Sequence, residues 1–306
     1  MANSSSASLY SSDAIKLKDG AQMWKRQWRG AGAVAMGAIL VSSLGWTSFA
    51  GAASFSAKSG AETATASFAG TFPKFHDVTL VVRRAGTIID QQPVRSKWCG
   101  GACGPNSYPS RASVVRFVRL GRSMSRDVVL SLYSGGAHCC TIEQVYVPRG
   151  GSKHYREVEF DFGDPGVRLM SIGVDGSDDF LSANDAFAYK FTDYAASGMP
   201  IEILAFYGDA FHNVTREYPD LIARDADQWS RAFRADAKSH YSDTVGVVAA
   251  WVADEDMLGK STIAQQFLQR EAAEGHLNSA LGSFEPHGEH YVTVLEAFLQ
   301  RQGYLK

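Results

Sequence analysis

The sequence predicts an α+β protein, with an antiparallel β-rich module followed by a bundle of about four helices. Two observations indicate this order. Between residues 75 and 217, apolar residues recur at every second position in short runs separated by Gly, Pro, Asn, Asp and Ser, which is typical of antiparallel strands joined by tight turns. From residue 218 onward, the apolar residues recur with a period of about 3.6, which is typical of helices.

The composition indicates a globular protein that does not bind nucleic acid as its main partner. The chain has 306 residues, of which 45% are hydrophobic and 20% are charged, so it can form a substantial core. Residues 1–52 carry five Lys or Arg and two Asp or Glu, which leaves 25 basic and 30 acidic residues, a net charge of −5, in the remainder. Phosphate binding needs a basic face, which this balance disfavours.

The first 52 residues have the pattern of a secretory signal peptide. A basic stretch at residues 25–29 precedes an apolar stretch at 31–44, and Ala-Gly-Ala at 50–52 matches a cleavage site with small residues. Met23 opens a more typical signal than Met1 does, so it is an alternative start. The apolar stretch is short for a membrane span. We therefore expect a secreted protein without a membrane span after cleavage, and a retained anchor is the alternative.

The rest of the chain divides into three predicted parts. Residues 53–74 are rich in Ala, Ser, Thr and Gly, so we expect a flexible lead-in. Residues 75–217 form the predicted β-rich, disulfide-bonded module, and 218–306 form the helical module. The expected strands lie at 78–83, 87–94, 113–120, 127–133, 141–147, 155–162, 167–172, 180–183, 187–191, 201–207 and 210–215. The expected helices lie at 219–238, 243–257, 261–275 and 291–300.

Four cysteines, Cys99, Cys103, Cys139 and Cys140, indicate two disulfides in an exported chain, and four cysteines allow three pairings. Adjacent cysteines rarely bond to each other, so we expect two bridges that join the 99–103 loop to Cys139 and Cys140. The alternative is local pairing of Cys99 with Cys103 and of Cys139 with Cys140. A metal site with His138 and a redox-active pair are further alternatives, although the cysteine spacing is not that of a standard zinc site.

An internal repeat is visible with an offset of 52 residues, from Leu120 to Ile172 and from Asp127 to Asp179. In each copy, a strand enters a polar loop and a second strand leaves it. Two copies are too few for a closed propeller, which needs at least about four blades. We therefore expect a curled sheet or sandwich that contains two propeller-blade-like hairpins.

Two stretches carry a resemblance to a known family. Residues 132–141 read Leu-Tyr-Ser-Gly-Gly-Ala-His-Cys-Cys-Thr, and residues 187–200 contain Phe-x-Tyr-x-Phe-Thr-x-Tyr-Ala-Ala-Ser-Gly. Both resemble motifs of a family of secreted bacterial proteins of uncharacterised function, and the resemblance covers about residues 110–230. The loops of the repeat resemble those of integrin-like FG-GAP and VCBS repeats, which bind calcium.

The resemblance implies calcium sites in the two repeat loops. The carboxylates that each loop contains determine whether we expect an ion there. The first loop, 121–127, has one carboxylate and two arginines, so we expect no ion there. The second loop keeps Asp175, Asp178 and Asp179, with Asp185 downstream, and these are the candidate calcium ligands. An ordinary Asp-Gly turn is the alternative. We expect no other cofactor.

No motif in the sequence identifies a reaction. A Gly-x-Ser-x-Gly elbow, a Walker loop, a dinucleotide fingerprint and Cys-x-x-Cys are all missing from the chain. We therefore expect a secreted, non-catalytic protein that binds a partner protein or a cell-surface polymer. One alternative is an extracellular hydrolase that uses carboxylates at 175–185, with His138 and Asp179 as candidate catalytic residues. The other is an extracytoplasmic thiol–disulfide protein.

Overall fold

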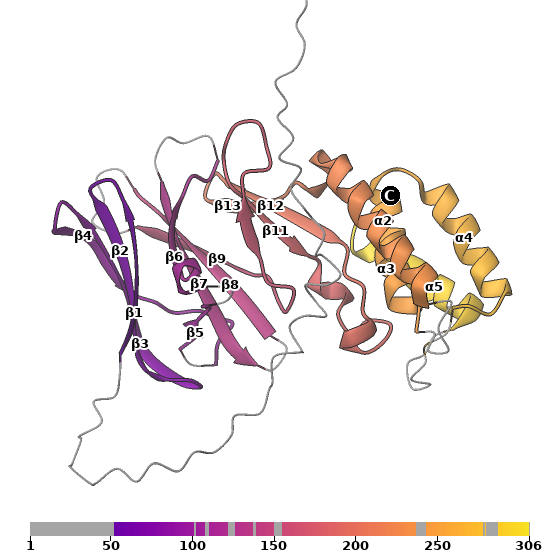
Figure 1. Cartoon of the computed structure of the whole chain (residues 1–306), viewed down its shortest axis with the longest axis horizontal. Helices are drawn as coiled ribbons and strands as arrows, with labels where there is room; N and C mark the ends of the chain where they lie inside the picture. Colours follow the sequence, from indigo (N-terminus) through magenta and orange to yellow (C-terminus); the bar gives the residue numbers. More distant parts are fainter. Residues whose placement is uncertain are drawn as a thin grey trace, which may run out of the picture. The chain divides into compact units, whose positions relative to one another are not determined.

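In the computed structural model, the described residues are 52–305 apart from 101, 108–109, 122–125, 137–138, 150–154, 237–242, 278 and 280–286. They belong to one compact unit, Ser48–Lys306. This part of the chain forms three antiparallel sheets followed by four α-helices (Figure 1). The predicted α+β class is thereby confirmed. The features that predict a signal peptide, up to residue 51, lie outside the described residues.

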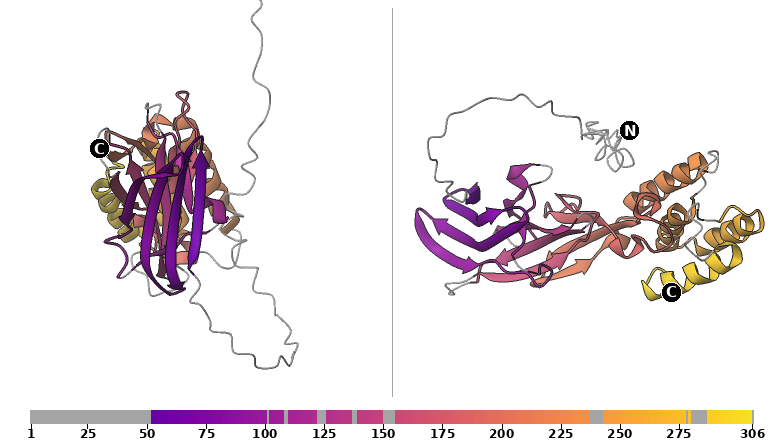
Figure 2. Two further views of the ribbon diagram at one scale, coloured as in Figure 1. Left: turned by 90° about the vertical axis from the view of Figure 1, so that its left-hand side faces the viewer. Right: turned by 90° about the horizontal axis from the view of Figure 1, so that it is seen from below.

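The first sheet is a meander in the order β1-β2-β3-β4, whose strands run side by side (Figure 2, left). The prediction of a flexible lead-in at 53–74 is wrong, because β2 pairs with both β1 and β3. Alternate residues of β2, Ala64, Ala66 and Phe68, are fully buried. The strands are β1 (Ala53–Ser59), β2 (Glu62–Thr71), β3 (Lys74–Arg84) and β4 (Thr87–Pro93).

The second sheet has the order β5-β7-β8-β9, and β6 also pairs with β7. Its central strand β7 is buried on both faces. Leu130 and Leu132 belong to a core shared with the first sheet, whereas Val129 belongs to a core shared with the third sheet. This explains the continuous apolar run in β7. The strands are β5 (Gly104–Pro105), β6 (Val115–Val118), β7 (Asp127–Gly136), β8 (Cys139–Val147) and β9 (Arg156–Asp161).

The third sheet is a meander in the order β10-β11-β12-β13. Its first hairpin matches the β6–β7 hairpin of the second sheet in register. Val118 pairs with Asp127 in one hairpin, and Met170 pairs with Asp179 in the other, so both partners are displaced by 52 residues. The strands are β10 (Arg168–Met170), β11 (Asp179–Ala183), β12 (Ile201–Tyr207) and β13 (Ala210–Asn213).

The helices follow β13 and pack on one another (Figure 2, right). Helix α3 is the most buried of them, because Val and Ala occupy most of its circumference. It packs against α2 and α4, and α4 packs against α5. None of the helices in the described ranges is long and apolar enough to cross a membrane. They are α2 (Pro219–Asp236), α3 (Val245–Met257), α4 (Ser261–Ala273) and α5 (Gly288–Arg301).

The segment between β11 and β12 joins the third sheet to the helices. The predicted strand at 187–191 is wrong, because this segment forms turns and the short 3-10 helices η2 (Asp185–Phe187) and η3 (Tyr194–Ala196). The Phe187 ring packs against Phe298 of α5, with ring centroids 4.9 Å apart. Phe187 and Phe191, two of the three alternating aromatic residues that suggested a strand, therefore pack on a helix.

A close backbone contact fixes the same segment on α3. A Cβ atom at Gly198 would lie 2.7 Å from the carbonyl oxygen of Gly246, and a Cβ atom at Gly246 would lie 2.4 Å from that of Ala196. Both distances are shorter than van der Waals contact, so only glycine fits at these two positions.

Candidate functional site

The cysteines pair locally. The Cα atoms of Cys99 and Cys103 lie 5.6 Å apart and the two residues form a disulfide, while Cys139 and Cys140 form a second disulfide across a cis peptide bond. The expected bridges between the 99–103 loop and the adjacent pair are therefore wrong, and the local alternative is correct. The turn at 99–103 brings its two cysteines within the range that a disulfide spans.

The first motif segment, residues 132–141, runs beside the turn that follows β9. The backbone N–H of Thr141 donates to the carbonyl of Gly163 at 2.9 Å, and the N–H of Phe162 donates to the carbonyl of Thr141 at 2.8 Å. Within the motif, Ser134 Oγ accepts the N–H of Cys140 at 2.6 Å. His138, the candidate ligand or catalytic base, lies outside the described residues.

The second motif segment, residues 187–200, reaches the same turn. The Tyr194 hydroxyl donates a hydrogen bond to the Asp164 carboxylate, and burial together with this carboxylate raises the pKa of Tyr194. The Tyr189 ring lies beside the Tyr194 ring, with centroids 5.5 Å apart. Burial, and then the negative charge of Asp164, also raise the pKa of Tyr133 from the first motif. The two motif segments thus converge on the turn that contains Asp164.

Two further carboxylates surround this turn. Asp161 Oδ1 accepts the N–H of Gly163 at 2.9 Å, and Asp185 Oδ1 accepts the N–H of Asp164 at 3.2 Å. A Cβ atom at Gly163, which has φ +62°, would lie 2.2 Å from Asp185 Cγ, so glycine is required. Burial, and then the negative charges of Asp164 and Asp161, raise the pKa of Asp185. We call this set the tyrosine–aspartate cluster: Tyr133, Asp161, Asp164, Asp185, Tyr189 and Tyr194.

The chemistry of the tyrosine–aspartate cluster favours a positively charged ligand group. Its carboxylates attract cations and accept charge-assisted hydrogen bonds, and tyrosine rings bind cations on their faces. Tyr189 is 49% exposed and has φ +57°, a left-handed conformation that a bulky residue rarely adopts. Its N–H donates to Ser197 Oγ at 3.0 Å, which holds this conformation. Such strained residues are concentrated at functional sites.

The four candidate calcium ligands do not come together as one set. Asp175 Oδ1 accepts bonds from the N–H and the hydroxyl of Ser177, at 3.0 and 2.7 Å, which closes a turn. Asp179 accepts the Tyr218 hydroxyl at 2.8 Å, and burial raises its pKa. Asp185 belongs instead to the tyrosine–aspartate cluster. Calcium binding by Asp175, Asp178 and Asp179 stays a prediction.

Asp127 occupies the position in the first repeat that Asp179 occupies in the second. It is 5% exposed. Burial, and then the negative charge of Asp209, raise its pKa from 3.8 to about 7, although the N–H of Leu120 donates to its carboxylate. Residues 122–125 of this loop lie outside the described residues. Asp127 therefore titrates near neutral pH.

The sequence alone does not identify Asp161 and Asp164 as site residues. Both lie in Asp-Phe-Gly-Asp-Pro-Gly at 161–166, which has the composition of an ordinary turn. Two glycines and two aspartates within six residues were the available signal. Their proximity to Tyr133 and Tyr194 depends on the tertiary fold.

No family model and no solved structure matches the chain. Two curated proteins are similar to it. An uncharacterised protein of Sinorhizobium fredii is 28% identical over 191 residues, which cover 60% of this chain and 28% of that protein. A probable thylakoid lumen protein of Synechocystis sp. is 26% identical over 202 residues, which cover 60% of this chain and 59% of that protein. The chain thus covers less than two thirds of either relative.

Proposed function

We propose that this protein is a binding protein that acts outside the cytoplasm, and that the tyrosine–aspartate cluster is its binding site. The observation that carries the proposal is the convergence of two motif segments, 132–141 and 187–200, on the acidic turn at residues 161–166, through the backbone of Thr141 and the hydroxyl of Tyr194. These are the segments that resemble a family of secreted bacterial proteins. A ligand site explains why both segments lie against one acidic turn.

Three observations support a location outside the cytoplasm. Residues 1–52 have the sequence pattern of a signal peptide. All four cysteines are paired in disulfides, which persist in oxidising compartments. One relative is named a probable thylakoid lumen protein. Fractionation of cells that produce the full chain tests this part, and recovery of the uncleaved protein in the cytoplasm would contradict it.

The proposed ligand group is a cation, such as a lysine or arginine side chain of a partner protein or an amino group of a cell-surface polymer. Asp161, Asp164 and Asp185 supply negative charge, and Tyr189 supplies an exposed ring. The chain after residue 52 carries a net charge of −5, which also attracts a basic partner. Because part of this attraction is between exposed charges, the affinity falls as salt concentration rises.

The test uses a fluorescein-labelled oligolysine peptide, with an oligoglutamate peptide as the negative probe, and measures anisotropy at low salt. We expect Asp164→Asn to weaken oligolysine binding about tenfold or more, since a hydrogen bond to a charged group contributes about 1.5–3 kcal/mol. Tyr189→Ala should weaken it about threefold, since an exposed cation–π contact contributes about 0.5–1 kcal/mol.

Two matched controls separate a site from general charge attraction. Asp209→Asn removes the same charge from the surface, where it pairs with Arg156 at 2.7 Å. Tyr207→Ala removes a tyrosine that is 50% exposed and lies outside the cluster. We expect both controls to change the affinity less than twofold. Equal losses in Asp209→Asn and Asp164→Asn would reject the tyrosine–aspartate cluster as the site.

A further inference from the structure

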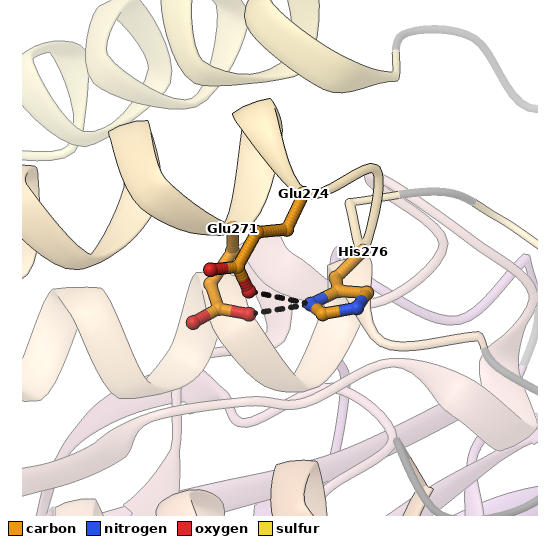
Figure 3. Close-up of side chains that lie close together, drawn as sticks. All are labelled: Glu271, Glu274 and His276. Atoms are coloured by element: carbon orange, nitrogen blue, oxygen red, sulfur yellow. Dashed lines mark hydrogen bonds and ion pairs between the residues drawn. The ribbon is translucent and has the colours of Figure 1, made fainter.

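A second group of polar side chains lies at the C-terminal end of α4, outside the tyrosine–aspartate cluster. Glu271, Glu274 and His276 place one ligand atom each within 4.8 Å of the other two. Figure 3 shows both carboxylates facing the same ring nitrogen of the histidine. His276 Nδ1 lies 2.9 Å from Glu271 Oε2 and 3.4 Å from Glu274 Oε2.

The backbone positions these three side chains together. Glu271 and Glu274 are three residues apart, so they share one face of the helix. Gly275 follows with φ +75° and reverses the chain, and the N–H of His276 donates back to the carbonyl of Glu271 at 2.9 Å. Thr244 Oγ1 donates to the carbonyl of His276 at 2.7 Å. Hydrogen bonds to its N–H and to its carbonyl therefore fix the backbone of His276.

Arg270 orients the buried carboxylate of Glu271, whereas Glu274 and His276 are open to solvent. Arg270 donates from Nε and Nη2 to Glu271 Oε1, at 3.1 and 2.9 Å, so the other oxygen, Oε2, faces the histidine. The Glu271 side chain is 8% exposed, whereas those of Glu274 and His276 are 51% exposed. Water can thus complete the coordination of an ion held by the three side chains.

The local charge also favours a cation. The two carboxylates and the Arg270 guanidinium leave one net negative charge at the C-terminal end of a helix, where the helix dipole is also negative. Imidazole nitrogen is a ligand for zinc and its neighbours in the transition series, whereas calcium and magnesium prefer oxygen alone. The donor set therefore selects a transition-metal ion.

We propose that Glu271, Glu274 and His276 bind one divalent transition-metal ion of the zinc type, with water as the remaining ligands. The ion joins the last turn of α4 to the chain that leads toward α5. This site is independent of the tyrosine–aspartate cluster and of the function proposed for it. All four cysteines are in disulfides, so thiolates do not compete for the ion.

The test is calorimetric titration of the full chain, without a purification tag, with zinc chloride. We expect one equivalent to bind, and His276→Ala to weaken binding more than about 100-fold, because loss of even an outer-shell partner costs about 10–100-fold. Glu274→Gln alters a half-exposed residue and should leave the fold intact while weakening binding at least tenfold. At these three side chains, calcium and magnesium should bind far more weakly than zinc.

The matched control is His287→Ala, which removes another exposed histidine from the N-terminal cap of α5. We expect its zinc affinity to equal that of the unaltered chain. Absence of zinc binding by the unaltered chain, or unchanged affinity in Glu274→Gln, would overturn the proposal. Calcium binding that is as tight as zinc binding and is weakened by Glu274→Gln would overturn the assigned class of ion.

Discussion

Asp127→Asn should stabilise the protein at alkaline pH and have little effect at acid pH. The pKa of Asp127 is raised from 3.8 to about 7 by burial and by the charge of Asp209. Since the folded-state pKa exceeds the unfolded-state pKa, the folded protein binds an additional proton between pH 4 and pH 7. The stability linked to this proton is fully present below about pH 4 and is lost as pH rises through 7.

The magnitude follows from the size of the pKa change. A rise from 3.8 to about 7 corresponds to about 4 kcal/mol, because one pKa unit is equivalent to about 1.4 kcal/mol. Relaxation of the folded protein around the charged carboxylate reduces this to about 2–3 kcal/mol. Asn keeps an oxygen that accepts the N–H of Leu120 and removes the charge, so Asp127→Asn should increase the free energy of unfolding by this amount at pH 8.

Urea denaturation at pH 4.5 and at pH 8 measures the effect directly. The change in unfolding free energy should be below about 1 kcal/mol at pH 4.5 and about 2–3 kcal/mol at pH 8. The control is Asp209→Asn. It removes the nearby negative charge and leaves Asp127 buried, so it should increase the free energy of unfolding at pH 8 by a smaller amount. A destabilisation by Asp127→Asn at pH 8, or an equal change at both pH values, would contradict a raised pKa of Asp127.

Two further substitutions test the packing. Arg116→Met leaves Glu143, which is 1% exposed and pairs with Arg116 at 2.8 Å, buried without its countercharge. It should destabilise by about 3–5 kcal/mol in urea denaturation. Adding Glu143→Leu should restore most of the lost free energy of unfolding. If it does not, the loss is not caused by the unpaired charge of Glu143. Gly198→Ala introduces a Cβ atom 2.7 Å from the Gly246 carbonyl oxygen and should lower stability by about 2 kcal/mol, whereas Gly100→Ala, in open space, should be neutral. Equal melting temperatures for these two glycine variants would contradict the close packing of Gly198 on the backbone of α3.

Alternation of apolar residues predicted most strands because one face of each strand is buried. It did not reveal β2, in which small residues such as Ala64 and Ala66 occupy the inward positions and give a weak apolar signal. Conversely, Phe187, Tyr189 and Phe191 alternate as in a strand. The two phenylalanines are buried against the helices, a partner that a local pattern does not specify.

The candidate site was predictable only in part. The two motif segments were predicted through their resemblance to a family of secreted proteins, and Asp185 was predicted as a carboxylate downstream of the second repeat loop. It did not indicate that Asp185 lies with Asp164 and Tyr194, because this depends on the turn at Gly163 and on the path of the chain after β11. The cysteine pairing was similarly undetermined, since three pairings satisfy the same sequence.

The segment between β11 and β12 combines two sets of residues with different roles. Phe187, Phe191 and Gly198 pack against the helices. Tyr189 and Tyr194, interleaved with them, belong to the tyrosine–aspartate cluster. Homologous sequences can therefore be classified by two separate criteria. A sequence that keeps the first set and lacks the two tyrosines should share the architecture and have lost the ligand, whereas one that keeps both sets should bind it.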